Sequence, residues 1–224
     1  VLAALAVGSL FILAVGADPL AVYAALLAGT FGSSYGFGQV LFKATPLIFA
    51  GLAVALAFRA GLFNIGAQGQ LEVGTFVLAL TGAWLPASWP APVLVTACVA
   101  AGLAGGAVWG AIPGVLKARL GSHEVINTLM LNFIAVAAIN YVLTGPLAVT
   151  GTMHTAAVPA EIARLDGWVP GFTGSPVNAS LGLALGAALF VYVLLWHTSL
   201  GYEIRAVGLA PAAAEVLPLL ASRG

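Results

Sequence analysis

The chain has 224 residues, of which 62% are hydrophobic and 6% charged, whereas charged residues make up about 25% of an ordinary soluble domain. Lys plus Arg equals Asp plus Glu at seven each, so the chain carries no basic excess to attract nucleic acid. Nucleic-acid binding is therefore excluded. One cysteine, Cys98, cannot form an intrachain disulfide, and the three histidines show no metal-ligand spacing, so we expect no metal site.

Six apolar segments are long enough to be membrane spans, since a spanning helix needs about 20 mostly apolar residues. They lie at 1–17, within 40–60, and at 70–85, 91–113, 125–143 and 179–196. Asp18-Pro19 ends the first span. In the second, Thr45-Pro46 is either an N-cap with its first helical residue or a proline kink. The sequence thus predicts an all-α, polytopic transmembrane helix bundle, with one domain over 1–224.

The connecting loops indicate an orientation in the membrane. Basic residues follow the second, fourth and sixth predicted spans: Arg59, then Lys117 and Arg119, then Arg205 and Arg223. Loops rich in Lys and Arg are normally cytoplasmic, and these alternate as six crossings require, with both chain ends inside. Tryptophans lie in or beside the outer loops, as in an interfacial aromatic belt: Trp84, Trp89 and Trp168.

Glycines recur every four residues in the fourth predicted span, at Gly102, Gly106, Gly110 and Gly114. This spacing forms a stripe along which a neighbouring helix can approach closely. Gly182 and Gly186 repeat the spacing in the sixth span. We expect tight helix packing at these positions rather than ligand binding.

Two segments outside the spans have a distinct composition. The outer loop at 144–178 is rich in Pro, Gly and Thr and is either a docking surface for an extracytoplasmic partner or a passive connector. Residues 19–39 are Gly- and Ser-containing and are expected to form an interfacial helix followed by a turn.

The stretch GLFNIGAQGQLEVG at 61–74 interrupts the apolar sequence with glycines and amides. Irregular backbone survives within a bilayer only inside protein or beside a water-filled cavity, and glycine-broken apolar segments point to a transporter's substrate site. Amides both donate and accept hydrogen bonds, which suits a neutral polyhydroxylated or heterocyclic solute. We therefore expect Asn64 and Gln68 to line a transport path; Gln70 belongs to the same polar cluster. Glu72 either shares that role or stabilises a helix start through the helix dipole.

A polar edge enters the fifth predicted span from the cytoplasmic side. Glu124, Thr128 and Asn132 fall within about 80° of one another on a helix, and Asn140 follows further on. These side chains either line the path or form hydrogen bonds between helices.

Catalytic patterns are missing from the sequence. It contains no GxxxxGK[ST] pattern and no Ser/His/Asp set, so we do not expect an enzyme, and ATP hydrolysis would belong to a separate subunit. A self-sufficient secondary transporter or channel for a small neutral solute is the alternative function, although such proteins normally need carboxylates or histidines within the membrane.

Three segments resemble the permease subunits of bacterial ABC importers for nucleosides or simple sugars, in the branched-chain amino acid/ribose-type permease family. They are TPLIFAGLAVALAFRAGLFNIGAQGQ at 45–70, HEVINTLMLNFIAVAAINYVLTGPL at 123–147 and GYEIRAVGLAPAAAE at 201–215. Their order and spacing match the family over about 40–215. The resemblance implies a multi-pass protein of the bacterial inner membrane that binds no cofactor itself.

The resemblance also implies partners and site residues. The expected partners are an ATP-binding cassette subunit that binds ATP, a second permease subunit, an extracytoplasmic solute-binding protein and the lipid bilayer. The pathway residues that it implies are Asn64, Gly66, Gly69, Gln70, Glu124, Thr128 and Asn132, to which the polar stretch at 61–74 adds Gln68 and Glu72. The expected contacts to the ATPase lie in a cytoplasmic coupling segment at 197–224: Gly201, Tyr202, Glu203, Arg205, Gly208, Pro211 and Ala213.

The coupling segment departs from the family pattern in two places. Ala210 stands where relatives usually have Asn, which costs a helix cap of about 1 kcal/mol, and Pro218 interrupts the helix that the pattern continues. The family carries further spans after this segment. We therefore expect the chain to be a portion of a longer permease or a truncated product, incomplete at its C-terminus and short of its first residues.

Overall fold

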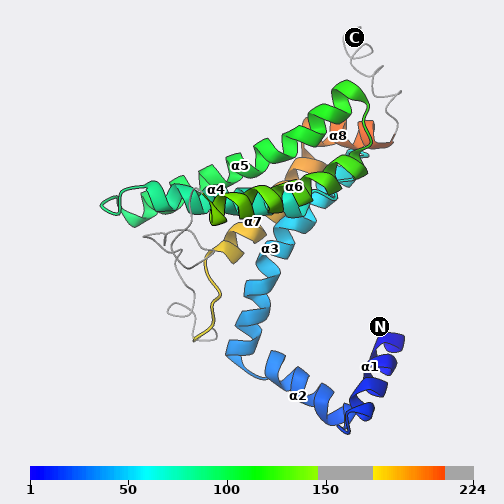
Figure 1. The fold of residues 1–224 in the computed structure, drawn as a ribbon. Helices are drawn as coiled ribbons and strands as arrows, with labels where there is room; N and C mark the ends of the chain where they lie inside the picture. Colours follow the sequence, from blue (N-terminus) through cyan, green and yellow to red (C-terminus); the bar gives the residue numbers. More distant parts are fainter. Residues whose placement is uncertain (146–173, 210–224) are drawn as a thin grey trace. The chain divides into compact units, whose positions relative to one another are not determined.

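The computed structural model describes residues 1–145 and 174–209, whose regular elements are helices (Figure 1). They are α1 (Leu2–Ala14), α2 (Pro19–Phe31), α3 (Ser34–Arg59), α4 (Ala67–Trp84), α5 (Ala91–Leu120), α6 (Glu124–Thr144), α7 (Ser180–His197) and α8 (Ser199–Leu209). The prediction of an all-α, polytopic helical protein is confirmed. Most of the predicted outer loop at 144–178 lies outside the described residues, as does the end of the coupling segment.

The chain forms two compact units, and the boundary between them falls within α3 and within α7. One unit comprises Val1–Pro46 and Ala163–Leu183, and the other comprises Leu47–Ile162 and Ala184–Gly224. We call them the N-terminal unit and the main unit. The predicted site residues all belong to the main unit.

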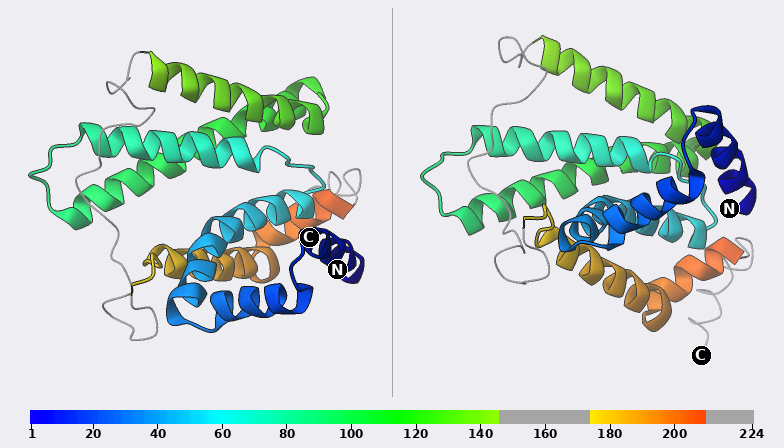
Figure 2. Two further views of the ribbon diagram at one scale, coloured as in Figure 1. Left: turned by 60° about the horizontal axis from the view of Figure 1, so that its bottom comes forward. Right: turned by 90° about the horizontal axis from the view of Figure 1, so that it is seen from below.

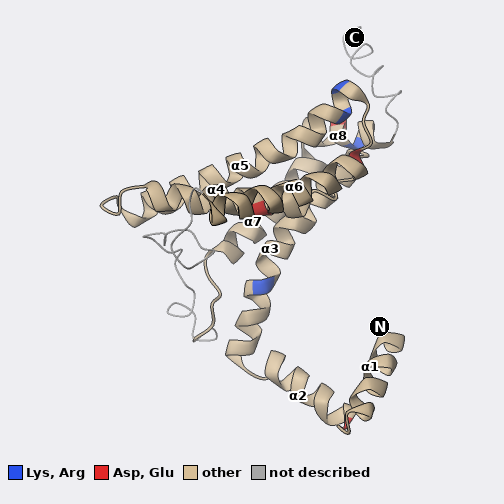
Figure 3. Cartoon of the chain, viewed as in Figure 1, with Lys and Arg blue, Asp and Glu red and all other residues tan. Residues whose placement is uncertain are grey.

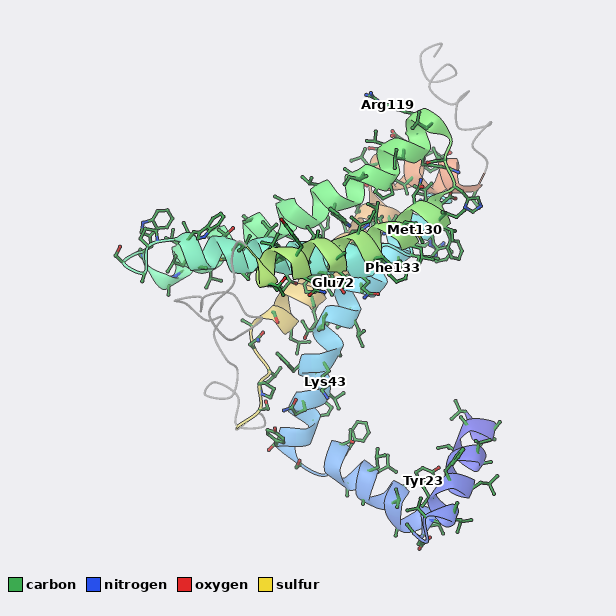
Figure 4. The ribbon with its side chains drawn as sticks, in the orientation of Figure 1. Tyr23, Lys43, Glu72, Arg119, Met130 and Phe133 are labelled. Atoms are coloured by element: carbon green, nitrogen blue, oxygen red, sulfur yellow. The ribbon has the colours of Figure 1, made fainter. Side chains whose placement is uncertain are left out.

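In the N-terminal unit, α1 and α2 form a bent pair with an angle of 114° between them. The Asp18 side chain accepts a hydrogen bond from the Leu20 amide at 2.9 Å, and Pro19 is the first residue of α2. Asp18-Pro19 therefore separates two helices, as an N-cap followed by a proline should. Across the bend, the Tyr23 hydroxyl donates to the Leu5 carbonyl at 2.9 Å; Figure 4 labels Tyr23 on α2.

The number of spans differs from the prediction of six. Among the described residues, four helices, α3, α5, α6 and α7, are long and apolar enough to cross a membrane, or five spans if the bent α1–α2 pair counts as one. The segment predicted as a span at 1–17 contains a helix of only 13 residues, which is about 20 Å long and shorter than the bilayer core of about 30 Å. The segment predicted at 70–85 lies in α4, which is too polar in its first turns because of Gln68, Gln70 and Glu72.

Pro46 lies inside α3, so the proposed N-cap at Thr45-Pro46 is wrong. The helix begins twelve residues earlier, at Ser34. The Thr45 hydroxyl donates to the Leu41 carbonyl at 2.9 Å, one turn back, rather than capping a new helix. The turn expected after the helix within 19–39 is short, because α2 ends at Phe31 and α3 begins at Ser34.

Helices α4 and α5 run side by side in the main unit, and α6 packs against α4 (Figure 2). The glycine stripe explains how closely α4 and α5 approach. A Cβ atom added at Gly102 would lie 3.1 Å from the Gly74 carbonyl oxygen, and one added at Gly106 would lie 3.1 Å from the Gln70 carbonyl oxygen. A Cβ atom added at Gly110 would lie 3.2 Å from the side-chain amide of Gln70. The packing role predicted for this stripe is confirmed at these three positions.

The stripe ends before Gly114, which has no described neighbour within 4 Å of an added Cβ. The same holds for Gly182 and Gly186 in α7. The packing contacts predicted at these three positions are therefore absent from the described part of the chain. Four-residue spacing alone does not identify the glycines that a neighbouring helix covers.

Candidate functional site

The main unit contains an irregular segment between the end of α3 at Arg59 and the start of α4 at Ala67. Gly61, its second residue, has a φ of +74°, a backbone conformation that favours glycine. Further along, the Asn64 side-chain oxygen accepts a hydrogen bond from the Gly66 amide at 2.9 Å, which closes a tight turn before the helix. The glycine-amide interruption seen in the sequence is thus a real break between two helices.

Asn132 of α6 ties this break to the neighbouring helix. Its side-chain oxygen accepts from the Gly69 amide at 2.9 Å, and its side-chain nitrogen donates to the Ile65 carbonyl at 3.0 Å. Gly69 lies in the first turn of α4, where backbone N–H groups lack partners within the helix. Because the N-cap residue, Gly66, has no side chain to satisfy them, α6 supplies a cap from a distance of 63 residues in sequence.

Helix α6 comes close at two glycines, Gly66 before α4 and Gly69 in its first turn. A Cβ atom added at Gly66 would lie 3.1 Å from the Thr128 Cβ, and one added at Gly69 would lie 2.8 Å from the Asn132 side-chain oxygen. Thr128 and Asn132 are buried, at 3% and 6% exposed. The Thr128 hydroxyl donates within its own helix to the Glu124 carbonyl at 2.8 Å. For Asn132 the structure has the interhelical hydrogen bonds that were one of the two expected roles.

Asn64 and Gln70 face each other across the break. Gln70 Nε2 donates to Asn64 Oδ1 at 3.3 Å, and Asn64 Nδ2 donates to Gln70 Oε1 at 3.4 Å. Both distances are long for N–H···O hydrogen bonds, and both residues are only part-buried. The two amides therefore retain hydrogen-bonding capacity for another polar group.

A cavity of about 200 Å³ lies beside this amide pair. It is lined by Ala57, Leu62, Phe63, Asn64, Gln70, Gly110, Pro113, Gly114, Lys117, Glu124 and Thr128. The cavity brings together part of each polar cluster predicted from the sequence: Asn64 and Gln70 from the break and α4, and Glu124 and Thr128 from α6. Ligand pockets usually enclose about 300–1,000 Å³, so this volume fits a narrow section of a path better than a complete binding pocket.

Lys117 and Glu124 form an ion pair at the edge of the cavity, with Nζ and Oε2 2.6 Å apart. Lys117 is in the last turn of α5 and Glu124 is in the first turn of α6. The positive charge therefore lies at the negative end of one helix dipole, and the negative charge at the positive end of the other, and both positions are favourable. Sequence reasoning placed Lys117 in a loop and Glu124 on the polar edge, and it missed their pairing. The sequence does contain a signal for this ion pair, because Lys117 and Glu124 carry opposite charges on either side of a short connection between two helices.

Gln68 and Glu72 lie on a different face of α4 from this cavity. Gln68 Nε2 donates to Glu72 Oε1 at 2.9 Å, one helical turn apart. Glu72 is beyond the first turn of α4, where the helix dipole has little effect, so its proposed role at the helix start is wrong. Figure 4 places Glu72 along the length of α4, far from Arg119 at the end of α5.

Basic residues gather at one end of the main unit, where α5 ends and α8 lies (Figure 3). Arg59 is in the last turn of α3, and Lys117 and Arg119 are in the last turn of α5. Arg59 and Arg205 of α8 both stack on the ring of Trp196. Basic residues from three loops that were predicted to be cytoplasmic thus lie at the same end of the main unit.

A second, apolar groove of about 440 Å³ lies between α3, α4 and α5 within the main unit. Gln70 also borders this groove, together with Gly74 and Thr75. Trp109 of α5 was not predicted as a site residue, although it lies inside the predicted span at 91–113. Its buried indole N–H has no hydrogen-bond partner among the described residues.

The predicted coupling residues 201–208 form most of α8. Gly201 is buried, whereas Tyr202 and Glu203 are exposed. Gly208 packs directly on the Arg59 carbonyl, which leaves no room for a Cβ atom, and its Cα lies 3.1 Å from a Cβ added at Gly61. The predicted residues Pro211 and Ala213 lie outside the described residues.

The chain matches the family model described as "Branched-chain amino acid transport system / permease component" over residues 36–218. It is 40% identical to the glucose ABC transporter permease protein TsgB13 of Haloferax volcanii, over 93% of this chain and 56% of the relative. It is 37% identical to the guanosine ABC transporter permease protein NupP of Bacillus subtilis, over 91% of this chain and 58% of the relative.

A third relative is the nucleoside ABC transporter permease protein NupB of Lactococcus lactis, 33% identical over 96% of this chain and 61% of the relative. The chain thus spans somewhat more than half the length of these relatives, and no solved structure matches it. The resemblance inferred from the three sequence segments is confirmed. This chain, a multi-pass membrane protein, belongs to the family of branched-chain amino acid transport system permease components.

Proposed function

We propose that the chain is part of the membrane-spanning permease of an ATP-driven importer and forms the translocation path for a nucleoside or a related small polar solute. The relatives named for guanosine, nucleosides and glucose support this solute class. All three are polyhydroxylated and uncharged, so amides can recognise them through paired donors and acceptors. ATP binding and hydrolysis belong to a separate subunit.

The observation that carries the proposal is the cavity beside the break, which polar side chains from two parts of the chain line together. Asn64 and Gln70 enter it from the break and from α4, and Thr128 and Glu124 enter it from α6. Polar groups within a membrane protein are costly unless they face protein or water. The other pathway residues have distinct roles: Gly66, Gly69 and Asn132 hold the break in shape, and Gln68 and Glu72 form a polar patch on another face of α4.

Uptake of labelled guanosine and glucose tests the proposal, in cells that lack the complete permease gene and in the same cells after complementation. We expect the gene to restore uptake of one of these solutes. Gln70→Met should lower that uptake about tenfold at unchanged membrane abundance, because loss of one hydrogen bond to solute costs about 1–1.5 kcal/mol. Gln39→Met, in the N-terminal unit, is the matched control and should transport normally. Uptake that is independent of the gene would reject the proposed solute class.

We further propose that the partners are an ATP-binding cassette subunit, a second permease subunit and an extracytoplasmic solute-binding protein. The coupling segment would contact the ATPase through the exposed side of α8, which includes Tyr202 and Glu203. Arg205 has a different environment, because it stacks on Trp196 and donates to the Gly201 carbonyl at 3.3 Å. Gly201 and Gly208 would keep α8 close to the helices that move, and Pro211 and Ala213 would extend the contact.

Charge reversal on α8 tests this coupling surface. Glu203→Lys should reduce co-purification of the ATPase subunit at least several-fold while leaving membrane insertion intact, since Glu203 is exposed and forms no ion pair among the described residues. Arg119→Glu also reverses a charge at this end of the main unit, but outside α8, and should co-purify normally. Equal recovery of the ATPase with both variants would contradict the assignment of α8.

A further inference from the structure

A cavity of about 440 Å³ in the main unit lies where the end of α3, the end of α7 and α8 meet. Its walls combine aromatic side chains with two arginines: Phe58, Arg59, Trp196, Tyr202, Arg205, Ala206, Gly208 and Leu209. None of the functions discussed above uses this cavity as a binding site. Its volume is within the range of small-molecule sites.

Two guanidinium groups share one indole ring in this cavity. The Arg205 guanidinium carbon lies 4.4 Å from the Trp196 ring centroid, and that of Arg59 lies 5.2 Å from it. Cation–π attraction holds each arginine in place, but it brings two like charges to the same ring. Neither arginine forms an ion pair with a carboxylate among the described residues.

Most of the hydrogen-bond donors of the two arginines are unused. Each guanidinium has five N–H donors, and the Arg205 Nε bond to the Gly201 carbonyl is the single hydrogen bond recorded for the pair within the described ranges. Guanidinium groups bind phosphate oxygens in a two-pronged geometry. An anion with several oxygens would use these donors and also remove the repulsion between the arginines.

The position of the cavity along the helices favours a lipid as the source of that anion. Arg59 is the last residue of α3 and Trp196 is next to the last residue of α7, and tryptophans and arginines at span ends lie at the depth of lipid headgroups. Phe58 is 50% exposed beside Arg59 and offers an apolar surface for the part of a lipid below its phosphate. The cytoplasmic leaflet also supplies anionic lipids.

We propose that this cavity, the Arg59–Trp196–Arg205 site, binds the phosphate headgroup of an anionic phospholipid from the cytoplasmic leaflet. The lipid headgroup bridges α3 to α8. This role is separate from the solute path, because the site shares no lining residue with the cavity beside the break.

Native mass spectrometry of the purified complete permease tests the proposal, with phosphatidylglycerol and phosphatidylcholine titrated as probes. We expect the wild type to retain phosphatidylglycerol in preference to phosphatidylcholine. Arg59→Gln should weaken phosphatidylglycerol binding about tenfold, which corresponds to the loss of one charge-assisted hydrogen bond. Arg119→Gln removes the same charge from the same end of the main unit but outside the site, and should bind like the wild type.

Two further arms exclude other sources of the anion. Inorganic phosphate should not displace the bound lipid, because it lacks the apolar part that contacts Phe58; displacement at comparable concentration would overturn the lipid assignment in favour of a free anion. Arg59→Gln should also leave ATPase co-purification unchanged. If this variant lost the ATPase and kept the lipid, the site would belong to the subunit interface, and equal lipid binding by both Gln variants would overturn the proposal. None of these readouts depends on which solute is transported.

Discussion

Asn132→Leu should lower the stability of the permease by about 2 kcal/mol, because it leaves the buried Gly69 amide and the Ile65 carbonyl without partners. Leucine is close to asparagine in size, so the change removes hydrogen bonds rather than volume. Measured hydrogen bonds between transmembrane helices average about 0.6 kcal/mol. We expect a larger effect here, because one side chain satisfies two backbone groups. Unfolding of the purified protein in mixed detergent micelles measures the difference.

Asn140→Leu is the matched control for this prediction. Asn140 lies on the same helix and is exposed, and its side chain forms no hydrogen bond recorded in the described ranges. The substitution should therefore change stability by less than about 0.5 kcal/mol. If the two leucine variants unfolded alike, Asn132 would not be what holds the break against α6.

Gly74→Ala should destabilise the contact between α4 and α5 by about 1–3 kcal/mol, the usual cost of overpacking. The added Cβ would lie 2.9 Å from the Gly102 carbonyl oxygen. That oxygen belongs to the backbone, so it cannot be relieved by a change of side-chain rotamer, and one helix must shift. The shift would also displace Gln70, which lies one helical turn before Gly74 and faces Gly106 and Gly110 on α5. The same unfolding measurement, combined with uptake, detects both consequences.

Gly114→Ala gives the contrasting result. An added Cβ there meets no described atom within 4 Å, and alanine favours a helix over glycine by about 1 kcal/mol in a helix interior. This variant should therefore be as stable as the wild type or slightly more so. A destabilisation equal to that of Gly74→Ala would mean that helix packing does not distinguish the two glycines.

The helical architecture could be predicted because each span is a local property of the sequence. A run of about 20 apolar residues must become a helix in a bilayer, since no other local structure satisfies its backbone. The predicted count of six spans was not reproduced where composition and length gave different answers. The segment at 1–17 is apolar enough, but its helix stops at Ala14, and α4 is long enough, but its first turns carry Gln and Glu.

The candidate site was only partly predictable, for the same reason. The sequence identified Asn64, Gln70 and Thr128 as polar residues in apolar surroundings, which depends on their neighbours in the chain. It left the role of Asn132 open, because whether its amide faces a solute or a backbone depends on a partner 63 residues away. It could not place Glu72 relative to a helix start without knowing that α4 begins at Ala67.

By itself the sequence determined the class of protein, the family and the segments that carry polar groups, because composition and motif order are read along one dimension. Tertiary structure decided which of those groups meet. It brought the amides of the break and the polar edge of α6 to one cavity, turned Gln68 and Glu72 to another face, and stacked Arg59 and Arg205 on one tryptophan. The physical reason is that contacts between helices depend on their rotation and separation, which glycines such as Gly74 and Gly102 set through distances of a few tenths of an ångström.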